Sequence, residues 1–294
     1  MAKDLCAASP AARALFGRAA EILGYDLLRV CAEGPKERLD TTAVAQPAIY
    51  VASLAAVEAM RERGGEEAAA VDACDAAAGL SLGEYTALAF AGAFSFEDGL
   101  RLVQLRGEAM QEAAAAARSG MVSVIGLDAD KVAELCAAAT EQAGGAGKAV
   151  QIANYLCPGN YAVSGSIEGC EAVEALGKPQ FKARMTVRLA VAGAFHTGYM
   201  QPAVARLEAA LASTPLVAPR IPVVSNVDAR PHSDPSEIRA ILARQVVSPV
   251  QWEATVRDLL ARGAGKSYEV GPGKVIAGTV KRIDKGAEVV NVTA

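Results

Sequence analysis

Gly79-Leu80-Ser81-Leu82-Gly83 is the stretch around which this chain is organised. It follows an apolar run over residues 68–78, interpreted as a strand, and leads into a helix-favouring segment that starts at Glu84. The order strand, Gly-x-Ser-x-Gly, helix is typical of a nucleophile elbow, in which glycines on both sides of the serine permit a tight turn. Ser81 is therefore a candidate nucleophile. The alternative is an ordinary strand-to-helix turn with Ser81 as the helix N-cap.

A serine nucleophile needs a neighbouring base, because its own pKa lies far above neutrality. The chain has two histidines, His196 and His232. His196 follows a predicted strand within Gly193-Ala194-Phe195-His196-Thr197, where small residues turn the chain toward the next helix. His232 stands in a polar, proline-marked loop, and we expect it to be exposed. The hypothesis for the catalytic centre is therefore Ser81 with His196.

The length, net charge and cysteine content of the chain exclude several classes of function. With 294 residues the chain can bury one large core with a smaller insert. A net charge of −4 gives no electrostatic basis for binding nucleic acid. The six scattered cysteines lack the spacing of a zinc site, so we expect reduced thiols and no metal. The apolar run 71–82 is broken by aspartates and glycines, so we expect no membrane span, and the amino terminus shows no targeting sequence.

Hydrophobic periodicity and capping signals predict an α/β fold in two parts. From Gly120 the order β-α-β-β-α-β predicts a ferredoxin-like unit. Elsewhere strands alternate with helices, which predicts a mostly parallel sheet covered on both faces. We therefore expect an α/β-hydrolase-like core over residues 1–118 and 192–294 and an inserted ferredoxin-like subdomain over 119–191. The predicted helices of the core cover 9–24, 41–63 with Pro47 in the first turn, 95–117, 198–212, 235–247, 252–262 and 274–283; its predicted strands cover 68–78, 222–226 and 266–270, the last clear strand.

Six segments follow one another in the order and spacing of a known family. They are Gly79-Leu80-Ser81-Leu82-Gly83-Glu84-Tyr85, Leu105-Arg106-Gly107-x-x-Met110-Gln111, Gly193-Ala194-Phe195-His196, Ser225-Asn226-Val227-Asp228, Ser248-Pro249-Val250-Gln251-Trp252 and Tyr268-Glu269-Val270-Gly271-Pro272-Gly273-Lys274. Together they resemble the malonyl-CoA:acyl carrier protein transacylases over nearly the whole chain. In that family a serine accepts malonyl from malonyl-CoA and passes it to the phosphopantetheine thiol of acyl carrier protein, in fatty acid biosynthesis.

The resemblance implies roles for residues near the serine. Ser81 is the acylated nucleophile, and His196 is the general base and later the acid. Gln245 matches the residue whose backbone carbonyl orients the histidine in place of a carboxylate. The backbone N–H of Leu82 matches one oxyanion donor.

The resemblance also implies a substrate-binding set. Arg106 matches an arginine that pairs with the free carboxylate of malonate, because a buried guanidinium without a carboxylate is costly. Phe195 matches a ring that limits room for an α-methyl branch. Met110 and Asn154 are expected near the pocket, where the alternative role of Asn154 is a buried polar group satisfied by backbone. No cofactor is implied, since malonyl-CoA is a substrate and phosphopantetheine is carried by the partner.

Two departures from the family pattern stand out. Leu80 replaces the histidine of most bacterial members and resembles the plant and algal plastid branch. This implies a plastid stroma location, with the mitochondrial matrix or cytoplasm as alternatives. The family also begins with a strand and a Gly-Gln-Gly segment that supplies the second oxyanion donor, and Met1-Ala2-Lys3-Asp4 resembles the sequence just after it. We therefore expect that segment to be missing, with a gap in the sheet.

Two other functions stay open on the sequence. The elbow alone permits a serine hydrolase or thioesterase, against which Arg106 argues. The expected missing strand permits an inactive homologue that only binds acyl carrier protein. For the transacylase implied by the resemblance, the expected partners are acyl carrier protein and malonyl-CoA, with no nucleic acid and no membrane, and a monomer is the expected state. Basic side chains that could dock the acidic carrier are Lys182, Arg184, Lys274, Lys281 and Arg282, although such charges are more often plain solvated surface.

Overall fold

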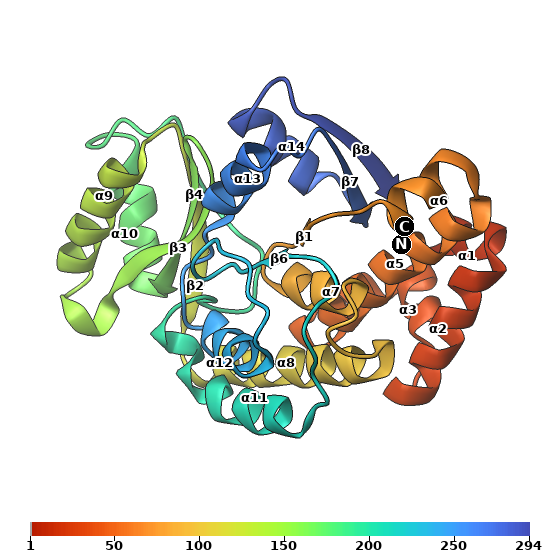
Figure 1. Cartoon of the computed structure of the whole chain (residues 1–294). Helices are drawn as coiled ribbons and strands as arrows, with labels where there is room; N and C mark the ends of the chain where they lie inside the picture. Colours follow the sequence, from red (N-terminus) through yellow and green to blue (C-terminus); the bar gives the residue numbers. More distant parts are fainter. Residues whose placement is uncertain (1) are drawn as a thin grey trace.

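Helices separated by short strands run through residues 2–294, the part of the chain that this computed structural model describes. The α-helices are α1 (Lys3–Ala8), α2 (Pro10–Leu23), α3 (Leu27–Glu33), α4 (Lys36–Leu39), α5 (Thr42–Arg63), α6 (Gly65–Asp72), α7 (Leu82–Phe90), α8 (Phe96–Ala116), α9 (Ala129–Gln142), α10 (Ile167–Gly177), α11 (Gln201–Ser213), α12 (Pro235–Gln245), α13 (Trp252–Ala261) and α14 (Val275–Ile283). The strands are β1 (Ala77–Ala78), β2 (Ser119–Ile125), β3 (Val150–Cys157), β4 (Asn160–Ser166), β5 (Met185–Arg188), β6 (Val223–Val224), β7 (Lys266–Gly271) and β8 (Glu288–Thr293). Figure 1 shows α7 at the centre, beside the short strands β1 and β6.

The expected mixed α/β fold is confirmed, and the strands of the expected core pair in parallel, although they form two short pairs and not one continuous sheet. Parallel strands form two separate pairs, β1 with β6 and β7 with β8. The largest sheet is antiparallel, in the order β3-β4-β2-β5. Strand β8 was not expected, because 266–270 was interpreted as the last strand. The β1–β6 pair positions the functional site, because it places the segment before Ser81 next to the segment before Ser225.

The predicted strand over 68–78 is wrong over most of its length. Helix α6 takes up its first half, and only Ala77 and Ala78 pair as a strand. Alanine is the best helix former, and Glu66 and Glu67 in the first turn of α6 favour the positive end of the helix dipole. Pro47 also lies inside α5 and not in its first turn, because the helix already begins at Thr42. Packing of a buried helix overrides the preference of proline for the helix start.

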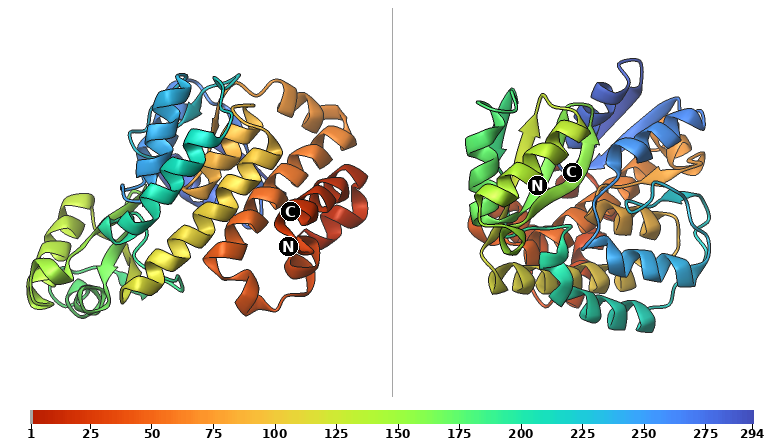
Figure 2. Two further views of the ribbon diagram at one scale, coloured as in Figure 1. Left: turned by 90° about the horizontal axis from the view of Figure 1, so that it is seen from below. Right: turned by 90° about the vertical axis from the view of Figure 1, so that its left-hand side faces the viewer.

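Residues 119–188 form the four-stranded sheet with helices α9 and α10 packed on it. The strand order β5-β2-β4-β3, antiparallel throughout, is the arrangement that the β-α-β-β-α-β pattern predicted. A separate hydrophobic cluster that includes Val122, Leu135 and Val163 joins the sheet to the helices. Figure 1 and the left view of Figure 2 both show this unit at one end of the molecule, opposite α1 to α3.

Helices α5 and α8 pack closely and carry side chains toward the elbow. A Cβ on Gly107 of α8 would lie 2.7 Å from the carbonyl oxygen of Thr42, so glycine is needed for the two helices to approach. By length and composition α5 could cross a membrane, but 67% of its apolar window is buried inside the structure. This burial is that of a core helix, as in Figure 1, where α5 runs behind α7.

Candidate active site

Ser81 occupies a strained turn at the start of α7. Its backbone angles are φ 53° and ψ −103°, a region that non-glycine residues rarely adopt. A Cβ on Gly79 would lie 2.1 Å from the carbonyl carbon of Gly83, so the turn excludes any side chain there. A Cβ on Gly83 would meet nothing within 4 Å, so the expectation that both glycines are required holds only for Gly79. The Ser81 side chain makes no N-cap hydrogen bond, unlike an ordinary helix start.

The amide of Asn226, just after β6, holds both sides of this turn. Its Oδ1 accepts a hydrogen bond from the backbone N–H of Ser81, and its Nδ2 donates to the carbonyl of Gly79 at 2.8 Å. Asn226 is fully buried. Because β1 and β6 are paired strands, the residues that follow them meet at one edge, which brings the asparagine to the elbow.

His196 faces Ser81 and is oriented from behind by a helix terminus. Its Nε2 lies 2.8 Å from Ser81 Oγ, and its Nδ1 lies 2.9 Å from the backbone carbonyl oxygen of Gln245. Gln245 is the last residue of α12, so its carbonyl has no intrahelical donor. A carbonyl can only accept, so Nδ1 carries the proton and the Nε2 lone pair faces the serine. This is the tautomer that a general base requires.

The electrostatics of the site keep His196 neutral. Burial, and then the positive charge of Arg106, lower the pKa of His196 from the ordinary 6.5 to about 4. The carbonyls of Gln245 and Ser248 oppose this shift. At neutral pH the imidazole is therefore unprotonated and able to accept the serine proton.

Arg106 reaches the nucleophile from α8 and is 1% exposed. One terminal nitrogen donates to Ser81 Oγ at 3.0 Å and to Gln245 Oε1 at 2.9 Å, and the other donates to Gln46 Oε1 at 2.7 Å. The guanidinium also lies over the Tyr85 ring, 5.3 Å from its centroid. Burial lowers the pKa of Arg106, although arginine stays charged in proteins. Its hydrogen-bonded oxygen partners within residues 2–294 are all neutral, so no carboxylate of the described chain neutralises this cation by contact.

Glu84 lies in the first turn of α7 and points into the protein. Its Oε2 accepts hydrogen bonds from the backbone N–H of Asn226 at 3.0 Å and from Gln245 Nε2 at 2.7 Å. Burial raises the pKa of Glu84 to about 7, against the opposing effects of these donors and of Arg106. Gln245 Nε2 also donates to the backbone carbonyl of Ser81 at 3.0 Å. A single polar network thus joins the acid, the amides and the nucleophile.

The other expected site residues lie at different distances from this network. Leu82 supplies the first N–H of α7, a position without an intrahelical acceptor. Met110 is buried one turn after Arg106, and its sulfur accepts from Gln46 Nε2 at 3.5 Å, so it helps to place the arginine. Phe195 is half-buried and packs against the cluster around Met110. Asn154 is buried on β3 next to Val250, and within residues 2–294 no hydrogen bond joins its side chain to the catalytic network.

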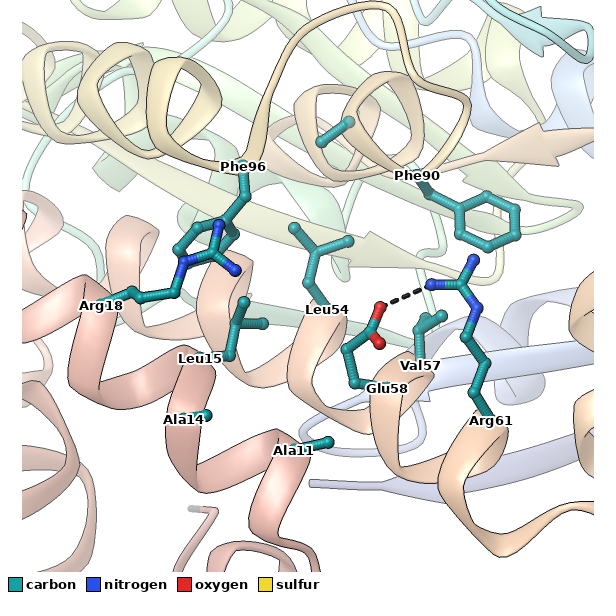
Figure 3. A pocket seen from close by; sticks show the side chains of 11 residues that line it. Ala11, Ala14, Leu15, Arg18, Leu54, Val57, Glu58, Arg61, Phe90 and Phe96 are labelled. Carbon is teal, nitrogen blue, oxygen red and sulfur yellow. Dashed lines mark hydrogen bonds and ion pairs between the residues drawn. The ribbon is translucent and has the colours of Figure 1, made fainter.

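A surface groove of about 420 Å³ lies elsewhere. Figure 3 shows its apolar floor between α2 and α5, with Arg18 beside Phe96, Arg61 beside Phe90, and Arg61 bonded to Glu58. Ser81 is not among the residues that line this groove, so we do not treat it as the reaction site. Within residues 2–294 there is also no group of three or more histidine, cysteine, aspartate or glutamate side chains able to hold a metal ion.

Comparison with known proteins places this geometry in a family. The acyl transferase domain family matches residues 1–292. The chain belongs to that acyl transferase family. The mitochondrial malonyl-CoA-acyl carrier protein transacylase of Mus musculus is 41% identical over 285 residues, which cover 95% of this chain and 74% of the mouse protein.

Solved structures agree with this acyl transferase assignment. The acyl-carrier-protein-S-malonyltransferase of Bartonella henselae superposes with a TM-score of 0.92 at 36% identity, covering 99% of this chain and 90% of its own. A malonyl-transacylase in complex with a type II polyketide synthase acyl carrier protein superposes with a TM-score of 0.91, also at 36% identity and with coverages of 99% and 90%.

Three residues of the acyl transferase site were given no role on the sequence: Gln46, Glu84 and Asn226. Glu84 and Asn226 stand inside quoted motifs, but an acid in a first helical turn or an asparagine after a strand has common local roles that hide a long-range one. Gln46 had no signal apart from the proline that follows it. The expectation that His232 is exposed is wrong, because its side chain is 12% exposed and bridges Asp228 and Glu237 at 2.9 and 3.0 Å.

Proposed function

We propose that this acyl transferase moves the malonyl group from malonyl-CoA to the phosphopantetheine thiol of acyl carrier protein through a malonyl ester on Ser81, in fatty acid biosynthesis. One observation carries the proposal: the buried Arg106 guanidinium lies 3.0 Å from Ser81 Oγ and has only neutral oxygen partners. In a malonyl ester the carboxylate carbon is three bonds from Oγ, within reach of this cation. Acetyl, which has no carboxylate, leaves the cation without a counter-charge.

The first half of the reaction acylates the serine. As Ser81 Oγ attacks the thioester carbonyl carbon of malonyl-CoA, His196 Nε2 takes the hydroxyl proton. The carbonyl oxygen becomes an oxyanion, which the N–H of Leu82 stabilises. When the carbon–sulfur bond breaks, the imidazolium returns the proton to the sulfur of coenzyme A. The Gln245 carbonyl holds the ring in one orientation through both proton transfers.

The second half reverses these roles with a different thiol. The phosphopantetheine thiol of acyl carrier protein gives its proton to His196 and attacks the malonyl ester carbon. The ester bond to Ser81 Oγ breaks, and the imidazolium protonates that oxygen. The serine is regenerated and the malonyl thioester leaves on the carrier, so the chemistry uses no cofactor.

Specificity rests on charge and on shape. A guanidinium binds a carboxylate through charge-assisted hydrogen bonds, each worth about 1.5–3 kcal/mol. We assign to Phe195 and Met110 the apolar wall that limits an α-methyl branch, since they belong to one cluster beside Arg106. Asn154 is the weakest member of the proposed substrate set, because it is bonded to none of the others.

Intact-mass spectrometry of the purified chain tests the proposed function. Brief incubation with malonyl-CoA should add one malonyl group, and acetyl-CoA should add little. Ser81→Ala should stay unmodified, and added acyl carrier protein should discharge the adduct from the parent chain onto its own thiol. An adduct lost equally fast to water and to carrier would support the thioesterase alternative. A folded chain that binds carrier but takes no malonyl would support the inactive homologue.

Carrier docking is proposed for basic side chains around α14 and the start of β5. Lys274, Lys281 and Arg282 are exposed on or next to α14, beside Val275, which is 67% exposed. Lys182 and Arg184 are exposed just before β5. An acidic carrier with an apolar patch complements such a surface. Neutralising all five should weaken carrier transfer and its salt dependence while acylation by malonyl-CoA stays unchanged; unchanged carrier affinity would remove this surface from the proposal.

Two further proposals rest on the sequence patterns. Leu80 before the nucleophile supports the plastid branch and hence the plastid stroma, which imaging of the protein in its own cells tests against mitochondria and cytoplasm. The order of β2 to β5 supports residues 119–191 as an inserted subdomain between core segments 1–118 and 192–294. Limited proteolysis should then cut near the two junctions before it cuts inside either unit.

A further inference from the structure

We propose that Glu84 is a positioning residue of the transfer reaction, which holds the nucleophile and its base in one geometry through the amide of Gln245 and the backbone of Asn226. This inference rests on the proposed function, because it names a residue that holds the catalytic groups of the same site in place. Within residues 2–294 no hydrogen bond joins Glu84 to His196 or to Ser81 Oγ; it acts through Gln245 and Asn226.

The first connection runs through Gln245. Glu84 Oε2 can only accept from Gln245 Nε2, at 2.7 Å, which sets the amide so that its oxygen faces Arg106 at 2.9 Å. The same amide nitrogen donates to the carbonyl of Ser81, while the backbone carbonyl of Gln245 accepts from His196 Nδ1. Gln245 therefore contacts the arginine and the serine backbone through its side chain and the histidine through its backbone carbonyl, and Glu84 holds that residue in place.

The second connection runs through Asn226. Its backbone N–H donates to Glu84 Oε2 at 3.0 Å, and its side-chain amide holds the backbone of Ser81 and Gly79 on either side of the turn. Ser81 has a strained backbone, which persists only when its surroundings over-determine it. The asparagine supplies that constraint, and the glutamate anchors the asparagine.

A purely structural role for Glu84 would not require this burial. An acid in a first helical turn is stabilised at the surface by the helix dipole and its free N–H groups. Glu84 is instead 3% exposed, where an unpaired carboxylate is costly. An apolar side chain would fill the space at lower cost, so the carboxylate is explained by the two donors that it orients.

The histidine tautomer gives a readout that does not depend on turnover. The chain has two histidines, so nitrogen-15 NMR of the histidine-labelled protein gives two sets of ring signals, and His232→Gln identifies those of His196. In the parent chain we expect His196 as the neutral form with its proton on Nδ1. In Glu84→Ala we expect a mixture of the two neutral tautomers, and malonyl-CoA acylation about 10–100-fold slower, mainly in kcat with KM changed by less than about threefold. Glu84→Gln keeps an oxygen for both donors and should retain the tautomer.

Glu269→Ala is the matched control. The Glu269 carboxylate also accepts two N–H groups, from Ile276 at 2.9 Å and Ala277 at 2.8 Å, but it caps α14 away from Gln245. The Glu269→Ala substitution should lower the melting temperature and leave the His196 signals unchanged.

Each outcome decides the inference. Glu84→Ala with parent histidine signals and acylation rate, at a lowered melting temperature, overturns it in favour of a structural role. If Glu84→Ala does not fold, Gln245→Leu removes the side-chain connection while keeping the backbone carbonyl that faces His196, and an acylation rate equal to that of the parent in this variant overturns the inference equally. A tautomer that depends on Glu84 in a chain that never accepts malonyl would leave the positioning role standing and refute the proposed function instead.

Discussion

Removing the Arg106 side chain is the sharpest test of how the site selects its substrate. Arg106→Ala deletes a buried cation together with its bonds to Gln46, Gln245 and Ser81. The bond to Ser81 Oγ is lost for malonyl-CoA and acetyl-CoA alike, so it cancels from the ratio of their rates. The carboxylate contact is lost for malonyl-CoA alone. The selectivity ratio therefore isolates the interaction that the structure assigns to the guanidinium.

The magnitude follows from the burial of this group. Truncating one partner of a buried, hydrogen-bonded charge pair costs about 2–5 kcal/mol. At about 1.36 kcal/mol per tenfold, the ratio of kcat/KM for malonyl-CoA over acetyl-CoA should fall by roughly 30-fold to 5,000-fold. Acetyl-CoA should react with Arg106→Ala at a similar or higher rate than with the parent, because no cation is left without a counter-charge.

Stopped acylation reactions read by intact mass give both rates on the same protein. Arg101→Ala is the control on the same helix, since Arg101 is exposed and forms a surface ion pair with Asp98 at 3.3 Å. It should leave the selectivity ratio within about twofold of the parent, as surface ion pairs contribute little. If Arg106→Ala slows acetyl and malonyl transfer by the same factor in a folded chain, the arginine acts on the serine and not on the carboxylate, and the reasoning fails.

Four other outcomes follow from the elbow and its base. Because the pKa of His196 is lowered to about 4, kcat/KM for acylation should stay flat as pH falls from 7 to about 5 and drop only near 4; an acid limb centred at 6.5 or above would contradict this. The same shift gives a contribution of His196 to folding stability that is full above pH 6.5 and is lost as pH falls from 6.5 toward 4, while the raised pKa of Glu84 gives the opposite slope. The stability of the parent minus that of His196→Gln, measured by denaturant unfolding at each pH, should therefore fall as pH falls from 6.5 toward 4. Gly79→Ala should lower the melting temperature and abolish acylation, while Gly83→Ala should leave the melting temperature unchanged or raised, and equal effects would refute the assignment of the tight contact to one glycine. The free energy of unfolding of Ser81→Gly, from denaturant titration, should exceed that of Ser81→Ala by about 1–3 kcal/mol. Both variants lack the hydroxyl, and only glycine relieves the backbone strain.

Local signals were enough to predict the parts of the site that a motif carries. Gly79 and Ser81 are residue types typical of turns, so the turn could be predicted from the local sequence. The chain has two histidines, which made His196 the candidate base. The ferredoxin-like order was readable because its strands and helices are short and capped, as Asp128 and Ser166 cap α9 and α10. The structure then brings Ser81 and His196 within 2.8 Å of each other, although 115 positions separate them.

The predictions that were wrong or missing have a different physical cause. Residues 65–72 are helix because alanine is a strong helix former, whereas the apolar run was interpreted as a strand from its hydrophobicity alone. Among the described residues, Ala77 and Ala78 pair with the two-residue strand β6. Gln46 and Glu84 could not be assigned, since each is defined by a partner far along the chain: Arg106 is 60 positions from Gln46, and Gln245 is 161 positions from Glu84. Hydrophobic periodicity predicts which face of a helix is buried, but it does not predict which polar group from a distant part of the chain will contact that face.

The arrangement of charges around Gln245 explains why the histidine is oriented by a carbonyl and not by an acid. A carboxylate at that point would add a negative charge to the network that contains Arg106 and would offset the cation that a malonyl group needs. A backbone carbonyl orients His196 without adding charge. The one buried acid of the network, Glu84, faces the nitrogen of the Gln245 amide while Arg106 faces its oxygen. The amide thus separates acid from cation, so the arginine is stabilised at a distance and remains available to the substrate.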